Sequence, residues 1–308
     1  MKINYVICTY GGIYARKFGH HPKQKEQYLK YNLILLNEIA TNIDTITIMR
    51  PKVDPDHIEI KDYYNFDGLH IDNILNKIRV IDCNNLGLSY GQFIFLLDKD
   101  LTDKNLYDYY IFTEDDYVPS LDFFEEELIN NYDRNIPNYL CAGINKELDN
   151  SKMMFQHEGS RFMVPDFSLG IISKENIEKF FNVWSWSSIK DIYEKAKQKP
   201  FNFIQILFGY FFYRAGIEIM EANQYLSVFY DCDHDLYLIN FQRYDRRADR
   251  KRTNSEVYNS PIFLPLDIFP PSDIDYTSRI NLISAYLNNQ KEFMRIYRRL
   301  RMRLTSLI

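Results

Sequence analysis

The sequence of 308 residues lacks several features that would assign it to a common class of protein. It has only four cysteines, Cys8, Cys83, Cys141 and Cys232, and their wide spacing matches no metal motif. Three of them stand in apolar, strand-like runs, which predicts reduced, buried thiols in a reducing compartment. No apolar run approaches the roughly 20 residues that a membrane-spanning helix needs, and the first residues enter a strand pattern without a signal peptide or transit sequence. We therefore expect a cytoplasmic protein.

The glycine motifs of the common nucleotide-binding enzymes are also missing. Neither a phosphate-cradling P-loop nor a dinucleotide-binding fingerprint occurs, which argues against kinases and dehydrogenases of those types. The net charge of −5 gives no reason to expect nucleic acid as a partner. With 46% hydrophobic and 26% charged residues, the chain has the composition of a folded protein, and its length fits one large domain with or without an appendage.

What the sequence does contain is a series of short apolar runs that alternate with helical periodicity. Strands are expected at residues 3–8, 43–49, 78–83, 107–113, 139–144, 167–172 and 225–230. Helices are expected at about residues 28–40, 88–97, 121–130, 174–182 and 203–214, and residues 52–76 are expected to form an irregular insertion. Alternating strands and helices predict an α/β fold with a mostly parallel sheet that helices cover on both faces.

Three loops of this predicted sheet are expected to meet. In open parallel sheets, ligands bind beyond the carboxyl ends of the strands, so the loops after Cys8, Cys83 and Thr113 should converge on one crevice. The last of these begins with the acidic run Glu114-Asp115-Asp116. Adjacent carboxylates repel one another unless a cation compensates, and their hard oxygens suit Mg²⁺ or Mn²⁺, which bind carboxylates together with substrate phosphates. The sequence therefore predicts a divalent-metal site at this strand end.

The order of these features resembles the GT-A-fold glycosyltransferases. A strand that ends in Glu114-Asp115-Asp116 looks like the acid-x-acid motif of that family, and the first strand and loop, YVICTYGG, resemble the start of its fold. Residues 85–91, NLGLSYG, are similar to the family's Asn-x-Gly turn, and residues 167–175, FSLGIISKE, look like its glycine-centred strand on the acceptor side. The resemblance covers residues 1–240. It implies a GT-A-like, Rossmann-like catalytic domain there and a metal-dependent hexosyl- or pentosyltransferase.

The resemblance also implies roles for particular residues. Metal ligands would be Glu114, Asp116 and His234, with Asp231, Asp233 and Asp235 as rivals of the histidine. The donor would contact residues at the ends of the strands: Thr9, Tyr10, Gly11, Arg50, Asp82, Asn85, Gly87 and Asp115. Within that set, Thr9 and Tyr10 would flank the base and ribose, and Arg50 and Asp82 stand where base recognition could occur. Asn85 and Gly87 would border the diphosphate and sugar, and Asp115 would lie near the ribose or the metal.

The general base is the least defined of these roles. Many inverting relatives carry an acidic pair at the start of a late helix, where this chain has Asn202-Phe203-Ile204-Gln205. The base would then be Asp166, just before the acceptor-side strand, or Glu158; otherwise the enzyme is retaining and needs no such base. The turn after Gly87 also departs from the family, because it has Gln92-Phe93 in place of an Arg-Asn pair.

Residues 241–308 differ from the rest of the chain. They form a basic, proline-marked extension that closes in a helix-like, arginine-rich segment. Such a helix either packs on the catalytic domain or lies on an anionic membrane surface, which would make the protein peripheral at the membrane.

These observations predict the transfer of a sugar from a UDP-sugar or GDP-sugar to a hydroxyl of a glycan, glycolipid or protein-linked acceptor, with Mn²⁺ or Mg²⁺. Two other functions stay open. A non-catalytic nucleotide-sugar or glycan-binding module would keep the fold without turnover, and Gln205 in place of an acid is consistent with that. A sugar nucleotidyltransferase would need a glycine-rich basic loop directly after the first strand, where this chain has Thr-Tyr-Gly-Gly.

Overall fold

The structure of the protein is a computed structural model, and it describes residues 1–14, 22–115, 117–119, 122–132, 138–141, 163–165, 169–196, 201–221, 229–231 and 236–238. Several of the predicted functional positions fall outside these ranges: Asp116, Glu158, Asp166, His234 and the basic extension 241–308. Each of these stays a prediction. Among the helices of the described ranges, none combines the length and the apolar character that crossing a bilayer would require.

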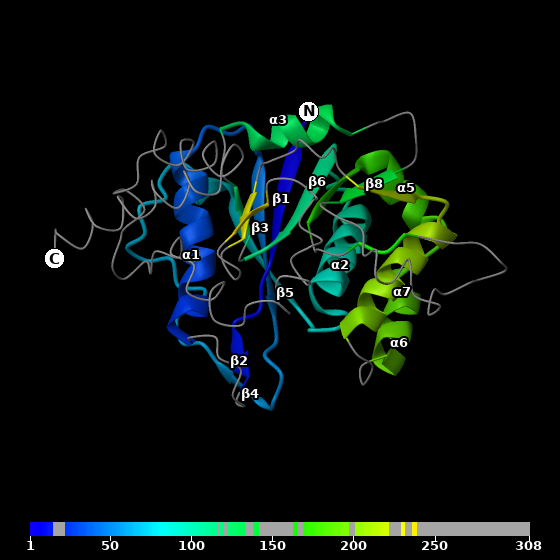
Figure 1. The fold of residues 1–308 in the computed structure, drawn as a ribbon, viewed down its shortest axis with the longest axis horizontal. Coiled ribbons are helices and arrows are strands. Elements are labelled where there is room, and N and C mark those ends of the chain that lie inside the picture. The colour runs from blue at the N-terminus through cyan, green and yellow to red at the C-terminus, as the bar shows by residue number, and fades with distance from the viewer. Residues whose placement is uncertain are drawn as a thin grey trace, which may run out of the picture.

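A seven-stranded sheet forms the centre of the molecule (Figure 1). In spatial order its strands are β10 (Glu218–Glu221), β8 (Asn138–Cys141), β9 (Gly170–Ser173), β6 (Tyr109–Glu114), β1 (Ile3–Cys8), β3 (Thr45–Pro51) and β5 (Ile78–Cys83). The strands β6, β1, β3 and β5 are parallel neighbours, whereas β9 runs antiparallel to both β6 and β8, and β10 is again parallel to β8. The predicted mostly parallel α/β sheet is therefore confirmed, with β9 as the reversed strand.

Helices cover both faces of the sheet because successive side chains of a strand point to opposite sides. On one face α1 (Pro22–Glu38) and α3 (Phe124–Asn130) share a core with Ile3, Tyr5 and Ile7 of β1. On the other face Val6 and Cys8 share a core with four helices: α2 (Leu88–Thr102), α5 (Lys174–Phe181), α6 (Trp186–Ala196) and α7 (Phe201–Arg214). The sheet is thus buried on both sides, as a mostly parallel sheet is expected to be.

The insertion between β3 and β5 has more structure than the sequence predicts. It contains the short strand β4 (His57–Glu59), which pairs antiparallel with β2 (Gly12–Tyr14), and the 3-10 helix η1 (Leu75–Lys77). Four of its apolar side chains are buried in the core beside α1: Ile60, Tyr63, Ile71 and Ile74. The predicted irregular insertion is therefore mostly turns and loops, but a short strand pair and buried side chains anchor it.

A small antiparallel sheet lies beside α1. Its strands, in spatial order, are β12 (Leu236–Leu238), β11 (Phe229–Asp231) and β7 (Tyr117–Pro119). The side-chain amide of Asn32 in α1 donates a hydrogen bond to the Tyr117 carbonyl at 2.9 Å, which ties this sheet to the helix. The strand predicted at residues 225–230 overlaps β11 at residues 229–230, and its other residues lie outside the described ranges. The pairing of β11 with β7 brings this part of the chain next to the residues that follow β6.

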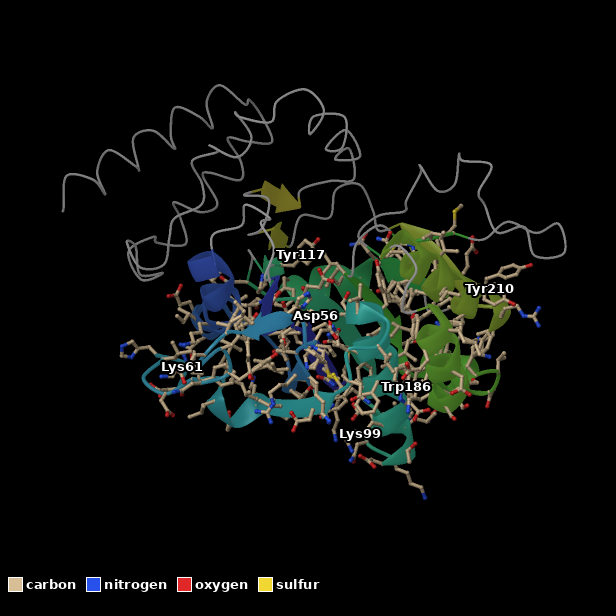
Figure 2. The ribbon with its side chains drawn as sticks, turned by 90° about the horizontal axis from the view of Figure 1, so that it is seen from below. Asp56, Lys61, Lys99, Tyr117, Trp186 and Tyr210 are labelled. Carbon is tan, nitrogen blue, oxygen red and sulfur yellow. The ribbon has the colours of Figure 1, made fainter. Side chains whose placement is uncertain are left out.

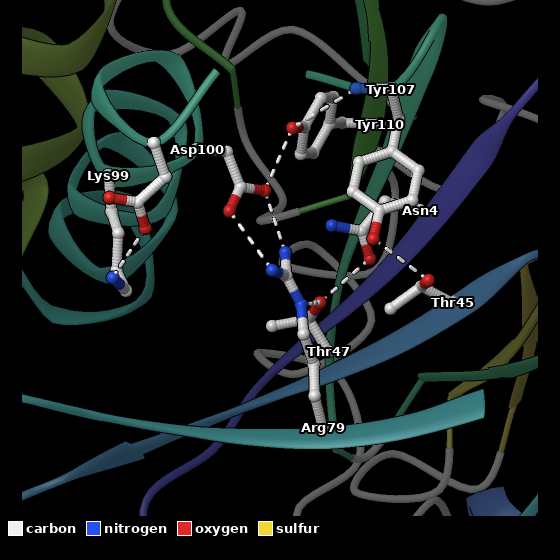
Figure 3. Close-up of polar contacts among 9 residues, drawn as sticks. Asn4, Thr45, Thr47, Arg79, Lys99, Asp100, Tyr107 and Tyr110 are labelled. Carbon is white, nitrogen blue, oxygen red and sulfur yellow. Dashed lines mark hydrogen bonds and ion pairs between the residues drawn. The ribbon is translucent and has the colours of Figure 1, made fainter. Parts of the chain in front are cut away.

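A buried charge network fixes α2 to the sheet near the amino ends of the strands (Figure 3). Asp100, close to the end of α2, is 1% exposed and accepts hydrogen bonds from the Arg79 guanidinium at 3.0 and 2.6 Å. The same carboxylate accepts a hydrogen bond from the Tyr110 hydroxyl at 2.8 Å, and Arg79 Nε donates to Thr47 Oγ1 at 2.7 Å. Helix α2 begins at the carboxyl ends of the strands, so this network anchors the opposite, C-terminal end of the helix.

Candidate functional site

The strand order reverses between β1 and β6. From β1 the chain builds outward through β3 to β5, and it then returns to add β6 on the other side of β1. In open α/β sheets, such a reversal opens a crevice outside the carboxyl ends of the two strands, where ligands bind. Cys8 pairs with Glu114 in the last register of β1 and β6, and the Asp115 N–H donates to the Cys8 carbonyl at 3.1 Å. The loop after β1 and the acidic run therefore start side by side at the reversal.

The loop after β5 reaches the same edge. The side-chain amide of Asn85 donates to the Asp54 carboxylate at 3.1 Å, and the Asp54 backbone N–H lies 3.4 Å from the Tyr10 hydroxyl. Figure 2 views the molecule from this edge, where the nearby side chain of Asp56 lies close to the middle of the view. The loops after β1 and β6 thus meet directly, and the loop after β5 is linked to them through Asp54; that the three form one crevice stays a prediction.

Tyr10 and His57 make a further contact, between the loop after β1 and strand β4 of the insertion. The Tyr10 hydroxyl is hydrogen-bonded to His57 Nδ1, and the two rings meet edge to face with their centroids 5.5 Å apart. His57 Nδ1 is also 3.9 Å from the Asp54 carboxylate. The sequence gives only a weak signal for this role, a lone histidine in a polar insertion. The tyrosine that was expected to flank the donor is therefore held by the β4 segment.

The two described carboxylates of the acidic run, Glu114 and Asp115, are half-buried. Asp115 Oδ2 accepts a hydrogen bond from the Tyr63 hydroxyl. Burial raises the pKa of the Cys8 thiol well above its usual value, and the charges of both carboxylates raise it further. Both carboxylates therefore act on the same buried thiol at the end of β1, which means that their negative charge is concentrated at the strand-order reversal.

The residues of this edge fit a divalent metal in their chemistry. Carboxylate oxygens at a crevice suit Mg²⁺ or Mn²⁺, which bind one or two carboxylates and leave other positions to water and phosphate. Among the described residues, no group of three or more His, Cys, Asp or Glu side chains could hold a metal ion. The register of β11 sets Asp231 opposite Tyr117, two residues after Asp115. The other predicted ligands, Asp116 and His234, lie outside the described residues.

A side chain from α2 holds the loop after β1. Gln92 is 3% exposed and brackets the Thr9 backbone: its Oε1 accepts from the Thr9 N–H at 3.3 Å, and its Nε2 donates to the Thr9 carbonyl at 3.0 Å. The Thr9 hydroxyl donates to the Met49 carbonyl at 2.6 Å. In the sequence Gln92 stands out only as a departure from the family's Arg-Asn pair. Its structural role is to fix the position of Thr9, whose contact with a donor stays a prediction.

Arg50 and Asp82, the candidates for base recognition, bind each other. They face one another in the register of β3 and β5, with Arg50 Nε and Nη2 at 2.5 and 3.0 Å from the Asp82 carboxylate oxygens. Their hydrogen bonds raise the pKa of Arg50 and lower the pKa of Asp82. The Arg50 guanidinium also lies 5.8 Å from the centre of the Tyr64 ring. Contact of either residue with a base stays a prediction, and such a contact would be made beside an existing ion pair.

Gly87 and Gly91 are required by the packing at the start of α2. Gly87 precedes the helix with a left-handed φ of +70°, and a Cβ there would lie 2.5 Å from the Tyr193 ring. A Cβ on Gly91 would lie 1.7 Å from the Leu86 carbonyl oxygen. The turn that resembles the family's Asn-x-Gly motif therefore has a structural reason for both glycines. The predicted contact of Gly87 with the diphosphate remains a separate prediction.

Gln205, which stands where many of the enzymes that the sequence resembles carry an acid, is a core residue. Its side chain is 1% exposed, and its amide donates to the Tyr90 hydroxyl of α2 at 3.4 Å. It therefore faces α2 rather than solvent. The two alternative bases, Glu158 and Asp166, lie outside the described residues, so their roles stay predictions.

No protein-family model matches the chain, and no curated protein matches it either. Solved structures do resemble it. The galactosyltransferase LgtC, in complex with donor and acceptor sugar analogs, is 14% identical over 71% of this chain and 73% of its own, with a TM-score of 0.42. The glycosyltransferase GlyE of Streptococcus pneumoniae TIGR4 is 12% identical over 87% of this chain, with a TM-score of 0.41, and the match spans 53% of the GlyE chain, about half its length.

Proposed function

We propose that the chain is a glycosyltransferase that moves a sugar from a nucleoside-diphosphate donor to a hydroxyl acceptor with the help of a divalent metal. The observation that carries this proposal is the meeting of Glu114 and Asp115 with the loop after β1 at the reversal of the strand order. A crevice of this kind suits a nucleotide, and adjacent carboxylates suit the cation that bridges to its phosphates.

The chemistry follows from the charge that develops during the reaction. As the sugar leaves, negative charge builds on the phosphate oxygens of the nucleoside diphosphate, and a bound Mn²⁺ or Mg²⁺ supplies Lewis-acid stabilisation of that charge. We assign Glu114 and Asp116 to hold the ion, with His234 as a third ligand and Asp115 beside the ribose or the metal. This assignment needs only carboxylate, imidazole and water or phosphate ligands, which are ordinary for these ions.

We assign the donor to the loops after β1 and β5 and propose a UDP-sugar or GDP-sugar. Tyr10 and Asn85 support this assignment because both contact Asp54, so a ligand that moves one loop also acts on the other. The acceptor is a hydroxyl of a glycan or glycolipid. If the reaction inverts the anomeric centre, Asp166 or Glu158 removes the proton of that hydroxyl; a retaining reaction needs no such base.

A thermal-shift screen of nucleoside diphosphates with and without Mn²⁺ or Mg²⁺ tests the proposal. Selective binding to the folded state at a hundredfold excess over Kd raises stability by about 2.7 kcal/mol, so melting should move up by several degrees. We expect the shift to require metal and nucleotide together and to select one base. No shift with any nucleoside diphosphate and either metal contradicts the proposal. Hydrolysis of the matching nucleotide-sugar then tests for turnover.

A non-catalytic nucleotide-sugar or glycan-binding module is the second candidate, and the burial of Gln205 favours it. Such a module would give the same metal-dependent thermal shift. It would not hydrolyse the nucleotide-sugar or transfer the sugar to any acceptor. Donor binding without either reaction, measured with the nucleotide-sugar that the screen selects, would favour this function over the transferase.

We propose that the protein works in the cytoplasm and that the basic extension 241–308 either packs on the catalytic domain or contacts an anionic membrane surface. Sedimentation with vesicles of an anionic phospholipid, compared with vesicles of a zwitterionic one, tests this contact on the full chain. Binding to the anionic vesicles that vanishes when residues 288–308 are removed supports it, and equal sedimentation of the two chains contradicts it.

A further inference from the structure

Two adjacent tyrosines of the insertion, Tyr63 and Tyr64, reach the strand-order reversal from the side of β4. Tyr63 is 2% exposed, and its hydroxyl donates to Asp115 Oδ2. The Tyr64 hydroxyl lies 2.6 Å from Thr9 Oγ1. Because the single proton of Thr9 Oγ1 is donated to the Met49 carbonyl, Tyr64 is the donor in this pair. One tyrosine thus binds the residue after β6, and its neighbour binds the residue after β1.

The tyrosine pair is held in place from several sides. The two rings pack edge to face, with centroids 4.9 Å apart and an angle of 77°. Just before them, the Ile60 N–H donates to the Gly11 carbonyl at 2.8 Å, and the Ile60 side chain is buried. Gly11 also leaves room for both rings, because a Cβ there would lie 3.0 Å from Tyr64 and 3.3 Å from Tyr63. The insertion is therefore a rigid support and not a loop that happens to touch the site.

A hydrogen bond from Tyr63 has a definite effect on the Asp115 carboxylate. It fixes the rotation of the side chain through one oxygen, Oδ2, and a hydroxyl donor does not neutralise the negative charge of the carboxylate. Groups that hydrogen-bond to carboxylates at metal sites orient them, and their loss typically lowers metal affinity about 10- to 100-fold. The bond from Tyr64 similarly sets the position of Thr9, on the opposite side of the reversal.

We propose that Tyr63 and Tyr64 are positioning residues for metal and nucleotide binding: Tyr63 orients the acidic run, and Tyr64 orients the loop after β1. This inference rests on the proposed function, because it concerns the same edge of the sheet. Neither residue stands in a motif that resembles the GT-A glycosyltransferases; both belong to the 52–76 insertion. Tyr63 acts through Asp115, and Tyr64 acts through Thr9.

The test uses three matched variants of the full chain: Tyr63→Phe, Tyr64→Phe and Tyr107→Phe. Each removes one tyrosine hydroxyl. Tyr107 is the control because its hydroxyl also bonds a threonine, Thr45 at 2.9 Å, but at the amino ends of the strands. Mn²⁺ affinity is measured by electron paramagnetic resonance in the presence of the nucleoside diphosphate that stabilises the parent chain. Nucleoside-diphosphate affinity is measured by calorimetry at saturating Mn²⁺, and melting temperature is recorded for all four proteins.

We expect Tyr63→Phe to weaken Mn²⁺ binding about tenfold or more, and Tyr64→Phe to weaken nucleotide binding severalfold. Tyr107→Phe should change neither affinity. In an Asp115→Asn background, Tyr63→Phe should have no further effect on Mn²⁺, since a residue that acts through another is silent when that residue is altered. Should Tyr63→Phe melt too low to titrate, Gly11→Ala provides the second variant. It displaces both rings but keeps both hydroxyls, and it should also weaken Mn²⁺ binding.

Two results overturn the inference alone: Mn²⁺ affinity in Tyr63→Phe equal to that of a parent that binds, or an equal loss in Tyr63→Phe and Tyr107→Phe. If the parent chain fails to bind Mn²⁺ in the presence of any of the nucleoside diphosphates, both the proposed function and this inference are overturned. The parent titration therefore separates the two failures.

Discussion

At the amino ends of the strands, Asp100 is buried against the guanidinium of Arg79, so a full positive charge matches a full negative one. At the carboxyl ends, Asp115 is held by the neutral hydroxyl of Tyr63, and its charge adds to that of Glu114 at the Cys8 thiol. An acid closed in a bidentate pair has little capacity for another ligand. A carboxylate oriented by a neutral donor keeps its negative charge, because a hydroxyl does not compensate it.

We therefore expect the residues at the amino ends of the strands to contribute mainly to stability and those at the carboxyl ends mainly to function. Changes at the amino edge should act on unfolding and leave ligand binding intact. Changes at the carboxyl edge should act on binding and reaction and have smaller effects on unfolding. Helix α2 connects the two edges, because Gly87 immediately precedes its first residue and Asp100 lies in its last turn.

The largest effect is expected from Asp116→Ala. Loss of the residue that we assign to the metal should lower sugar transfer, or hydrolysis of the donor, by about 10²- to 10³-fold, as loss of an electrostatic stabiliser of the leaving charge typically does. The melting temperature should stay close to that of the parent chain. Asp103→Asn, an exposed acid at the end of α2, is the control and should keep full activity. Full metal-dependent turnover in Asp116→Ala would disprove the assignment.

The second prediction concerns the amino edge. Asp100→Ala leaves the Arg79 guanidinium without its carboxylate in a largely buried position, so unfolding free energy should fall by about 3 kcal/mol. Urea denaturation measures this loss, and the folded variant should bind metal and nucleotide like the parent. Asp103→Ala breaks an exposed pair on the same helix, with Lys99 Nζ 2.7 Å from the carboxylate, and should lower stability by less than about 0.5 kcal/mol. Similar losses in the two variants would remove the distinction between the edges.

Much of the sheet could be predicted because short, continuous apolar runs mark strands in either direction of the chain. The direction of β9 could not, because an apolar run has the same composition in both directions. The strands β2, β4, β7 and β12 have three residues each, which is too short for a period to appear. Helix α6 was not predicted, although its sequence has helical periodicity: its buried residues Ile189, Tyr193 and Ala196 are spaced four and three residues apart.

The candidate site could be predicted where chemistry and strand ends coincide, as at Glu114 and Asp115. The residues that orient this edge were missed for a physical reason. Tyr63 and Gln92 act through contacts with distant parts of the chain, 52 and 83 residues away from their partners. Neither the composition nor the hydrophobic periodicity of a sequence predicts a contact between residues so far apart. The adjacent tyrosines of KDYYNF, aromatic residues in a polar insertion, were the one local sign.

A third prediction asks whether Gly87 is required for packing or only for binding. Gly87→Ala combines the strain of a φ of +70° with a Cβ 2.5 Å from the Tyr193 ring, so unfolding free energy should fall by about 2 kcal/mol. Gly68→Ala is the matched control, because Gly68 has a φ of +77° and a Cβ there would meet nothing within 4 Å; its loss should be about 1 kcal/mol. Urea denaturation of both variants gives the difference. Equal losses would mean that the Tyr193 contact relaxes freely and that Gly87 is not a packing requirement.

The smallest effect is a pH dependence at the carboxyl edge. Burial, and then the charge of Asp82, raise the pKa of Cys83 to about 12, against a usual value of 9.0. Above pH 9 the unfolded chain loses a thiol proton that the folded chain keeps, so unfolding free energy falls as pH rises, by at most about 1.4 kcal/mol per pH unit. Below pH 8 both states keep the proton and Cys83 adds no slope.

Urea denaturation of the parent and of Cys83→Ala between pH 8 and 9.5 measures this contribution as a difference in slope, which is independent of any constant loss from the smaller side chain. The parent should lose somewhat under 1 kcal/mol more than the variant over this range. Tyr110→Phe is the control from the amino edge. Burial and then the Asp100 charge raise the pKa of Tyr110 above its usual value of 10.0. The Tyr110 hydroxyl therefore stays protonated in the folded and unfolded chain over most of this pH range. Its slope should match the parent. If unfolding free energy falls equally with pH in the parent and in Cys83→Ala, the Cys83 thiol is hydrated in the folded chain. The end of β5 would then be more open to water than its packing implies.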